Sequence, residues 1–313
     1  MSTLAAVPAL TLGEIRTCLL MNNAILPRAT TLDLLRLLPG ERVRVADRPI
    51  MRAVSPETVT GVDCGLPARS GANVRGVGTI AAHAAVTAGR VLQGSASVAL
   101  VPSPSNTRVG WSHYMARPGV VETVGRVRFE DVAEGFLAGG ASQGVIDLGA
   151  VGDRMISRVQ AHHDLDRDPP FRSARTWLRW SLELAPGPPR AAFRVGDGGI
   201  RTLRMTAAPE HAADAAGFCE DIAYHDWLLT TLLALIDKVE AATVTGRDPL
   251  EALRPAVLHL LHLWMPGAHT APSMRPLWAG FERYPGFSRQ WDAIVARIRD
   301  RMALHTIEAR GKG

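Results

Sequence analysis

The side chains with the greatest capacity for chemistry gather in CEDIAYHDW, residues 219–227. Thiol, carboxylate and imidazole groups bind a metal ion or transfer protons when several converge on one point. A helix turns about 100° per residue, so Cys219 points about 120° from His225, and Asp226 points about 100° from it. These three residues therefore cannot share one site. Asp221 lies one turn before His225, and this is the local pair that the spacing allows.

His225 lies in the middle of an apolar helical stripe. The stripe consists of Phe218, Ile222, Leu229, Leu232 and Ile236. A single imidazole in such a place is typical of a core residue with one or two hydrogen-bond partners. We expect His225 to be buried, to hydrogen-bond Asp221 or a backbone carbonyl, and to bind no metal. Trp227 lies opposite the stripe, where we expect it to contact the β-rich half of the chain or a partner protein.

The dipeptide His225-Asp226 is also similar to the metal-binding pair of a phosphohydrolase class that needs further ligands from other helices. His259 and His262 are the candidates for those ligands. The apolar face of their own predicted helix contains Leu253, Val257, Leu260 and Trp264. Because helices pack through their apolar faces, both histidines should point away from His225. A metal-dependent hydrolase centred on the helical part of the chain is therefore one alternative function, and it is not the favoured one.

Two further stretches begin like known ligand-binding motifs but lack features that those motifs require. HHDLDRD, residues 162–168, begins like a calcium loop, but Pro169 replaces the required glycine and Arg175 the required glutamate. The stretch RGVGTIA, residues 75–81, contains G-x-G-x-x-A but is followed by a predicted strand, and no acidic residue occurs before Glu122. We therefore expect an exposed acidic loop at residues 162–168, and we predict no cofactor.

No acidic residue occurs between Asp63 and Glu122, the region that contains the segment 64–121. That segment carries five arginines: Arg69, Arg75, Arg90, Arg108 and Arg117. Their charge equals the formal net charge of +5 for the whole chain, so the remaining residues sum to zero. An acid-free basic segment can attract nucleic acid or another polyanion, which is a second alternative function. Ordinary solvated arginines on a β-rich surface would give the same composition.

Polar and aromatic residues are densest in WSHYMARPGVVETVG, residues 111–125. Ser112 and His113 are adjacent, so on a strand they would face opposite sides and could not act as nucleophile and base. The stretch 117–119 is expected to turn, which would let Glu122 pair with Arg117. We expect a structured turn that docks the two parts of the chain against each other. The alternative is contact with a ligand, partner or polyanion, for which Trp111, His113 and Arg117 are the candidate residues.

Hydrophobic periodicity divides the chain of 313 residues into two parts. Residues 1–206 are rich in Gly, Pro and β-branched residues, which predicts a mostly β domain with small helices. Residues 207–313 predict a helical bundle with helices near 211–242, 249–265, 273–283 and 288–307. The fold class expected is therefore α+β.

No apolar run reaches the roughly 18 residues that span a bilayer, and three cysteines fit a reducing compartment. We therefore expect a cytoplasmic protein without membrane contact.

Four stretches carry a resemblance: GVGT, WSHYMARPGVVETVGRV, FCEDIAYHDWLLTTLLALI and LHLLHLWMPGA. Through them, residues 10–306 resemble an uncharacterised actinobacterial protein family. Its members look like accessory components encoded beside a variant P-loop protein and a methyltransferase. The resemblance implies a non-catalytic assembly or adaptor subunit whose partners are proteins of the same gene neighbourhood, such as the variant P-loop protein. No catalytic residue comes with it.

Overall fold

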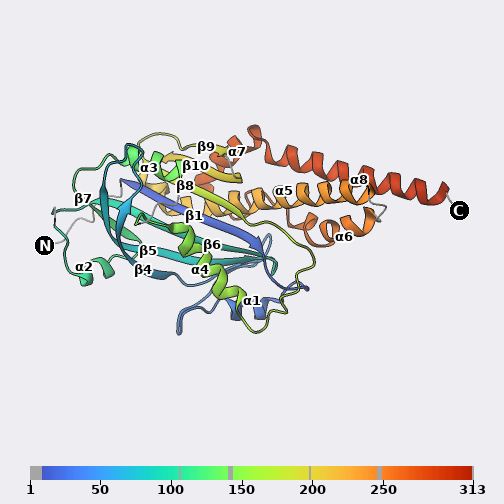
Figure 1. Cartoon of the computed structure of the whole chain (residues 1–313), viewed down its shortest axis with the longest axis horizontal. Coiled ribbons are helices and arrows are strands. Elements are labelled where there is room, and N and C mark those ends of the chain that lie inside the picture. The colour runs from blue at the N-terminus through green and yellow to red at the C-terminus, as the bar shows by residue number, and fades with distance from the viewer. Residues whose placement is uncertain (1–8, 106, 140–143, 197–198, 245–248, 312–313) are drawn as a thin grey trace.

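We describe the fold from a computed structural model, which covers residues 9–105, 107–139, 144–196, 199–244 and 249–311. Within these ranges the strands form one mixed ten-stranded sheet with helices on both faces (Figure 1). A large β-rich part is followed by helices, so the α+β class predicted from the sequence is confirmed.

The sheet follows the order β2-β3-β5-β7-β6-β1-β8-β10-β9, and β4 also pairs with β5. Its strands are β1 (Leu10–Leu19), β2 (Arg44–Ala46), β3 (Arg52–Val54), β4 (Thr58–Leu66), β5 (Val74–Thr87), β6 (Val91–Pro102), β7 (Val120–Val124), β8 (Thr176–Leu184), β9 (Arg190–Val195) and β10 (Ile200–Ala207). Strands β6 and β7 pair in parallel, as do β8 and β10. Strands β9 and β10 form a hairpin, with β10 next to β8 and β9 outermost.

Alternation along the central strands separates two hydrophobic cores, because successive side chains of a strand point to opposite faces. Leu92, Ala96 and Val98 of β6 belong to one core. Leu178 and Trp180 of β8 belong to the other. Each face of the sheet therefore needs its own helical layer.

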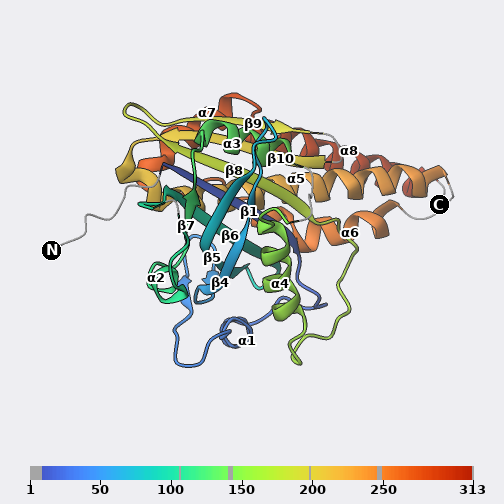
Figure 2. The ribbon, with the colours of Figure 1, turned by 60° about the vertical axis from the view of Figure 1, so that its left-hand side comes forward.

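The first layer comes from the β-rich part of the chain. It contains α3 (Phe129–Ala138) and α4 (Leu148–Gln160), while α1 (Arg28–Leu34) and the short α2 (Trp111–Met115) lie at the periphery (Figure 2). Asp147 caps α4 by accepting a hydrogen bond from the Ala150 amide. Gly152 of α4 lies against Gly94 of β6, where both residues lack a side chain and the two backbones approach closely.

The second layer is the C-terminal bundle, which follows a 3₁₀ turn at Pro209–Asp214. It contains α5 (Ala215–Val244), α6 (Pro249–His259), α7 (Arg275–Arg283) and α8 (Phe287–Gly311). Helices α5 and α8 run side by side and extend past the strands (Figure 1). Side chains of α5 pack directly on β1 and β8. The two parts that the sequence distinguishes at residue 206 therefore share one core across that boundary.

Two local expectations have clear outcomes. Ser112 and His113 lie on the short helix α2 and not on a strand, so they do not occupy opposite faces of the sheet. Among the described helices, none combines the length and the apolar character needed to cross a bilayer.

Candidate functional site

A cavity of about 410 Å³ lies between one edge of the sheet and the beginning of α5. Strands β2 and β3 form one wall, and residues from 213–217, where the 3₁₀ turn joins α5, form another. Its charged and imidazole lining groups are Arg44, Arg52, Glu57, His83, Asp214, Glu220 and His269. These side chains come from five separate segments of the chain, so the cavity exists only in the folded protein.

Glu220 is the central residue of this cavity. Its two carboxylate oxygens accept from different elements: Oε2 lies 2.5 Å from the Arg52 Nη2 on β3, and Oε1 lies 2.7 Å from the His83 Nε2 on β5. The side chains of Arg52 and Glu220 are 8% and 6% exposed, so both charges are buried. A buried charge is tolerated only when it is paired and hydrogen-bonded, as it is here.

Gln93 of β6 extends the network beneath this pair. Its side-chain amide donates to the backbone carbonyl of Glu220 at 2.9 Å, and its oxygen accepts from Arg52 Nη1 at 3.2 Å. His83 and Gln93 occupy odd positions of their strands, which face α5, whereas the even positions face α4. Strand alternation therefore delivers two polar side chains to one point below the helix.

The network shifts the proton affinities of two groups. Burial opposes ionisation of Glu220, but the His83 and Arg52 contacts outweigh it and lower the pKa of the carboxyl to about 2. Burial, together with the charge of Arg52, lowers the pKa of His269 to about 4. At neutral pH, Glu220 is therefore ionised and His269 is neutral. The Nε2 atom of His269 is buried and has no hydrogen-bond partner within the described part of the chain.

These facts limit what the cavity can do. An ionised Glu220 can only accept a hydrogen bond, so His83 donates to it through Nε2. Glu220 itself stays ionised near neutral pH and does not serve as a proton donor. The described lining contains no hydroxyl, thiol or amine side chain that could act as a nucleophile. The cavity thus offers charged and hydrogen-bonding groups suited to holding a polar ligand.

The candidate arginines of the segment 64–121 form ion pairs with carboxylates or lie in the interior of the protein. Arg75 and Arg108 both contact Asp63, at 2.7 and 3.2 Å. Arg69 contacts Glu134 at 2.9 Å. The carboxylates that the segment lacks therefore come from its border at Asp63 and from α3, and they neutralise much of its charge.

Two candidate residues lie in the interior. Arg90 is 1% exposed and donates to the backbone carbonyls of Asn22 and Asn23. Trp227 is fully buried, and its Nε1 donates to the carbonyl of Ala174 at 3.1 Å. Trp227 therefore contacts the β-rich part, one of the two contacts expected for it. Neither side chain is part of a surface that a partner or polyanion could reach.

The turn after α2 has the predicted ion pair. Glu122 is almost fully buried, and its Oε1 accepts from Arg117 at 2.6 Å and lies 2.7 Å from His113 Nε2. Trp111 is 40% exposed and lies under the guanidinium of Arg108. His113 and Arg117 therefore hold the turn together, and Trp111 is the candidate residue of this turn with the most exposed aromatic surface.

His225 is buried, as predicted. Its Nδ1 lies 2.7 Å from the backbone carbonyl of Asp221 and 3.6 Å from the Asp221 carboxylate. The carboxylate instead accepts from the Gly267 amide and the Thr270 hydroxyl, both at 3.0 Å. Asp221 thus connects α5 to the segment before α7, and of the two partners expected for His225 the carbonyl is the closer one.

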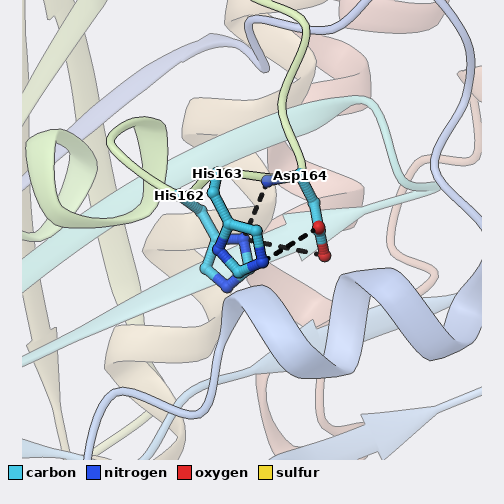
Figure 3. A group of neighbouring side chains, drawn as sticks. All are labelled: His162, His163 and Asp164. Atoms are coloured by element: carbon cyan, nitrogen blue, oxygen red, sulfur yellow. Dashed lines mark hydrogen bonds and ion pairs between the residues drawn. The ribbon is translucent and has the colours of Figure 1, made fainter.

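The residues considered for a metal-dependent hydrolase lie in different surroundings. Asp226 pairs with Arg201 at 2.6 Å, and His259 lies beside Arg90 and Phe171. Within the described residues, the side chains close enough to hold a metal ion are His162, His163 and Asp164 (Figure 3). That cluster lies at the start of the predicted acidic loop, most of which is exposed as expected.

The sequence did not point to Arg52, His83 or His269. Glu220 lies in the segment that attracted attention, but its partners are 168 and 137 residues away. One feature of the sequence could have indicated the site: the isolated His83 in the small-residue stretch AAHAAV.

Comparisons of the chain with protein-family models, with curated proteins and with solved structures find no match.

Proposed function

We propose that this chain is a non-catalytic adaptor subunit of a multi-protein assembly, and that the cavity at Glu220 recognises a polar group of a partner. One observation carries the proposal: the cavity holds ionised and hydrogen-bonding groups, but Glu220 is fixed between Arg52 and His83, and no side-chain hydroxyl, thiol or amine lines it within the described residues. Such a site supports binding of a polar group.

The location of the cavity supports binding of a macromolecule. Strand β2 is an end strand of the sheet, and its three residues line the cavity. Arg44 on this strand is exposed, whereas Arg52 behind it is buried. A partner that reaches the edge of the sheet would meet Arg44 first and the half-buried His269 further in. The resemblance to proteins encoded beside a variant P-loop protein and a methyltransferase names the first partners to test.

The two alternatives receive less support from the contacts. Polyanion binding through the segment 64–121 would use arginines that already contact Asp63, Glu122 and Glu134 or are buried.

A hydrolase built on His225, Asp226, His259 and His262 would need these side chains to converge. Asp226 instead pairs with Arg201, and His259 lies beside Arg90.

The test is co-expression of the chain with each protein of its gene neighbourhood, followed by size-exclusion chromatography with light scattering. We expect one neighbour to co-elute at fixed stoichiometry. Reversing the charge at the cavity rim with Arg44→Glu should weaken that complex. The matched control is Arg126→Glu, the same change at an exposed arginine that does not line the cavity. Elution of the chain alone with every neighbour would contradict the adaptor function.

A further inference from the structure

Strand β9 lies at the end of the sheet opposite to β2 and pairs with β10 alone. Amide and carbonyl groups of alternate residues point away from the paired neighbour in a strand. Among the described residues, those outward groups of β9 have no backbone partner. Such an edge can pair with an extended segment of another chain.

A groove accompanies this edge. It has a volume of about 630 Å³ and lies between β9 and α7. Its apolar and aromatic lining includes Phe193, Leu277, Phe281 and Tyr284. Phe193 packs edge-on against Phe281 at a ring distance of 6.0 Å, which fixes one wall. Tyr284 is 82% exposed, the most exposed of the large apolar side chains that the structure describes.

The charges at the groove have one sign. Arg190, Arg194 and Arg283 line it, and its lining contains no Asp or Glu. These three guanidinium groups contact no carboxylate within the described ranges. The arginines of the segment 64–121 differ in this respect, because carboxylates or backbone carbonyls engage them. An unpaired cationic rim favours an anionic partner.

Alternation along β9 divides these features between two faces. Phe193 faces the helical bundle, so Ala191 and Val195 share its side, and Arg190, Ala192 and Arg194 face the other way. A strand added to this edge would present its own side chains to the same two faces. Opposite charges on neighbouring strands stabilise pairing, and so do apolar pairs. The strand that matches β9 therefore alternates acidic with apolar residues.

We propose that β9 binds an extended segment of a partner protein in which acidic and apolar residues alternate, and that this segment continues the sheet as an additional strand. Its acidic side chains pair with Arg190 and Arg194. Its apolar side chains enter the groove beside Phe193 and Tyr284. The proposal rests on the adaptor function and names the chemistry of the partner.

Charge also distinguishes a partner from a second copy of the chain. Two β9 strands paired edge to edge would bring the arginines of both copies together, and like charges on neighbouring strands destabilise the pairing. Edge arginines on their own would serve only to discourage aggregation. An edge that only prevented aggregation would not need an aromatic groove, and such a groove lies beside these arginines.

The direct test uses a fluorescein-labelled peptide of alternating glutamate and valine, measured by fluorescence polarisation with the full chain. We expect saturable binding that weakens with salt. The double variant Arg190→Glu, Arg194→Glu should bind at least tenfold more weakly, whereas Arg126→Glu should bind as the wild type does. A peptide of alternating lysine and valine should not bind. Absence of binding, or equal binding of both peptides, overturns the proposal.

Backbone pairing is tested by N-methylating the peptide at its glutamates or at its valines. Alternate amides point to the same neighbour, so one of the two modified peptides should lose binding and the other should keep it. Equal loss or equal retention would contradict strand addition. A dimer of the free chain that the double variant dissolves would show that a second copy occupies the edge, which also overturns the proposal.

The co-expression experiment separates this inference from the adaptor function. If a neighbour co-elutes with the wild type and equally with the double variant, the partner docks elsewhere and only the inference at β9 fails. If a complex forms with the wild type and is lost with the double variant but not with Arg126→Glu, both stand. If no neighbour co-elutes with the wild type, the adaptor function itself fails.

Discussion

His83 on β5 and Glu220 on α5 are separated by 137 residues in the sequence, yet His83 Nε2 and Glu220 Oε1 lie 2.7 Å apart. The contact joins the sheet to the first helix of the bundle at a buried position. Arg52 on β3 holds the other carboxylate oxygen. A sheet strand near its edge, a central strand and a helix thus meet at one ionised group, and this makes Glu220 sensitive both to mutation and to pH.

Glu220→Gln should lower the free energy of unfolding near neutral pH. The folded-state pKa of about 2 lies below the ordinary value of 4.5, so the carboxylate stabilises the fold fully above about pH 4.5. This contribution is lost as the pH falls from 4.5 through 2, because the unfolded chain takes up the proton first. A shift of this size corresponds to about 3 kcal/mol. Denaturant melts from pH 7 to pH 2 should show the difference between wild type and variant shrinking with acid.

The control for Glu220 is Glu57→Gln. Glu57 lines the same cavity but is exposed and makes no ion pair within the described residues. Its variant should follow the wild-type pH dependence closely. A Glu220→Gln variant whose deficit stays constant down to pH 2 would show that the side chain matters through packing and not through its charge.

Leu229→Ala and Ile236→Ala should each destabilise the protein by about 2–5 kcal/mol, because both side chains are nearly completely buried in the core shared with the sheet. Leu233→Ala is the control on the same helix, since its side chain is 38% exposed. Chemical denaturation measures all three. A loss at Leu233 equal to that at Leu229 would contradict the assigned face of α5.

Gly94→Ala should destabilise the protein by about 1–3 kcal/mol through overpacking. A Cβ atom at this position would collide with the backbone carbonyl of Gly152 on α4 and meet Ile156 at 2.9 Å. Gly217 is the control, because an added Cβ meets nothing within 4 Å there. Gly217→Ala should leave stability unchanged or raise it by about 0.4–1 kcal/mol, as expected for a helical glycine. Thermal melts that rank these variants in the opposite order would contradict the close packing of α4 on β6.

His225→Ala should lower stability by a few kcal/mol, because the ring is fully buried and lies against Trp264 and Trp278 at 4.9 and 5.3 Å. His225→Phe is the matched variant: it keeps a ring and loses the hydrogen bond to the Asp221 carbonyl.

We expect elemental analysis of protein purified without chelator to find no stoichiometric transition metal. About one zinc, manganese or iron per chain, lost in His225→Ala, would instead favour the hydrolase.

The sequence predicted the helices of the bundle because their signals are local. Hydrophobic periodicity indicates these helices, and the burial of His225 follows from its place on a helical stripe. Position within the sheet does not follow in this way. Strand β10 lies between β8 and β9, and this order follows from pairing between strands and not from the pattern within any one strand. The expected turn at residues 117–119 was also local, and its partner Glu122 is close in sequence.

The sequence by itself determined the α+β class, the helical bundle and the apolar face of α5, since these depend on periodicity over a few turns or strand residues. Only the tertiary structure decided where the charges lie. In the folded chain Arg90 is buried, and Asp63 and Glu134 form ion pairs with arginines of the acid-free segment. His83 and Arg52 both contact Glu220. The tertiary structure also left the arginines of β9 unpaired at a free edge. Ion pairing depends on distance in space, and the periodicity of a sequence does not encode which charged residues of different elements become neighbours.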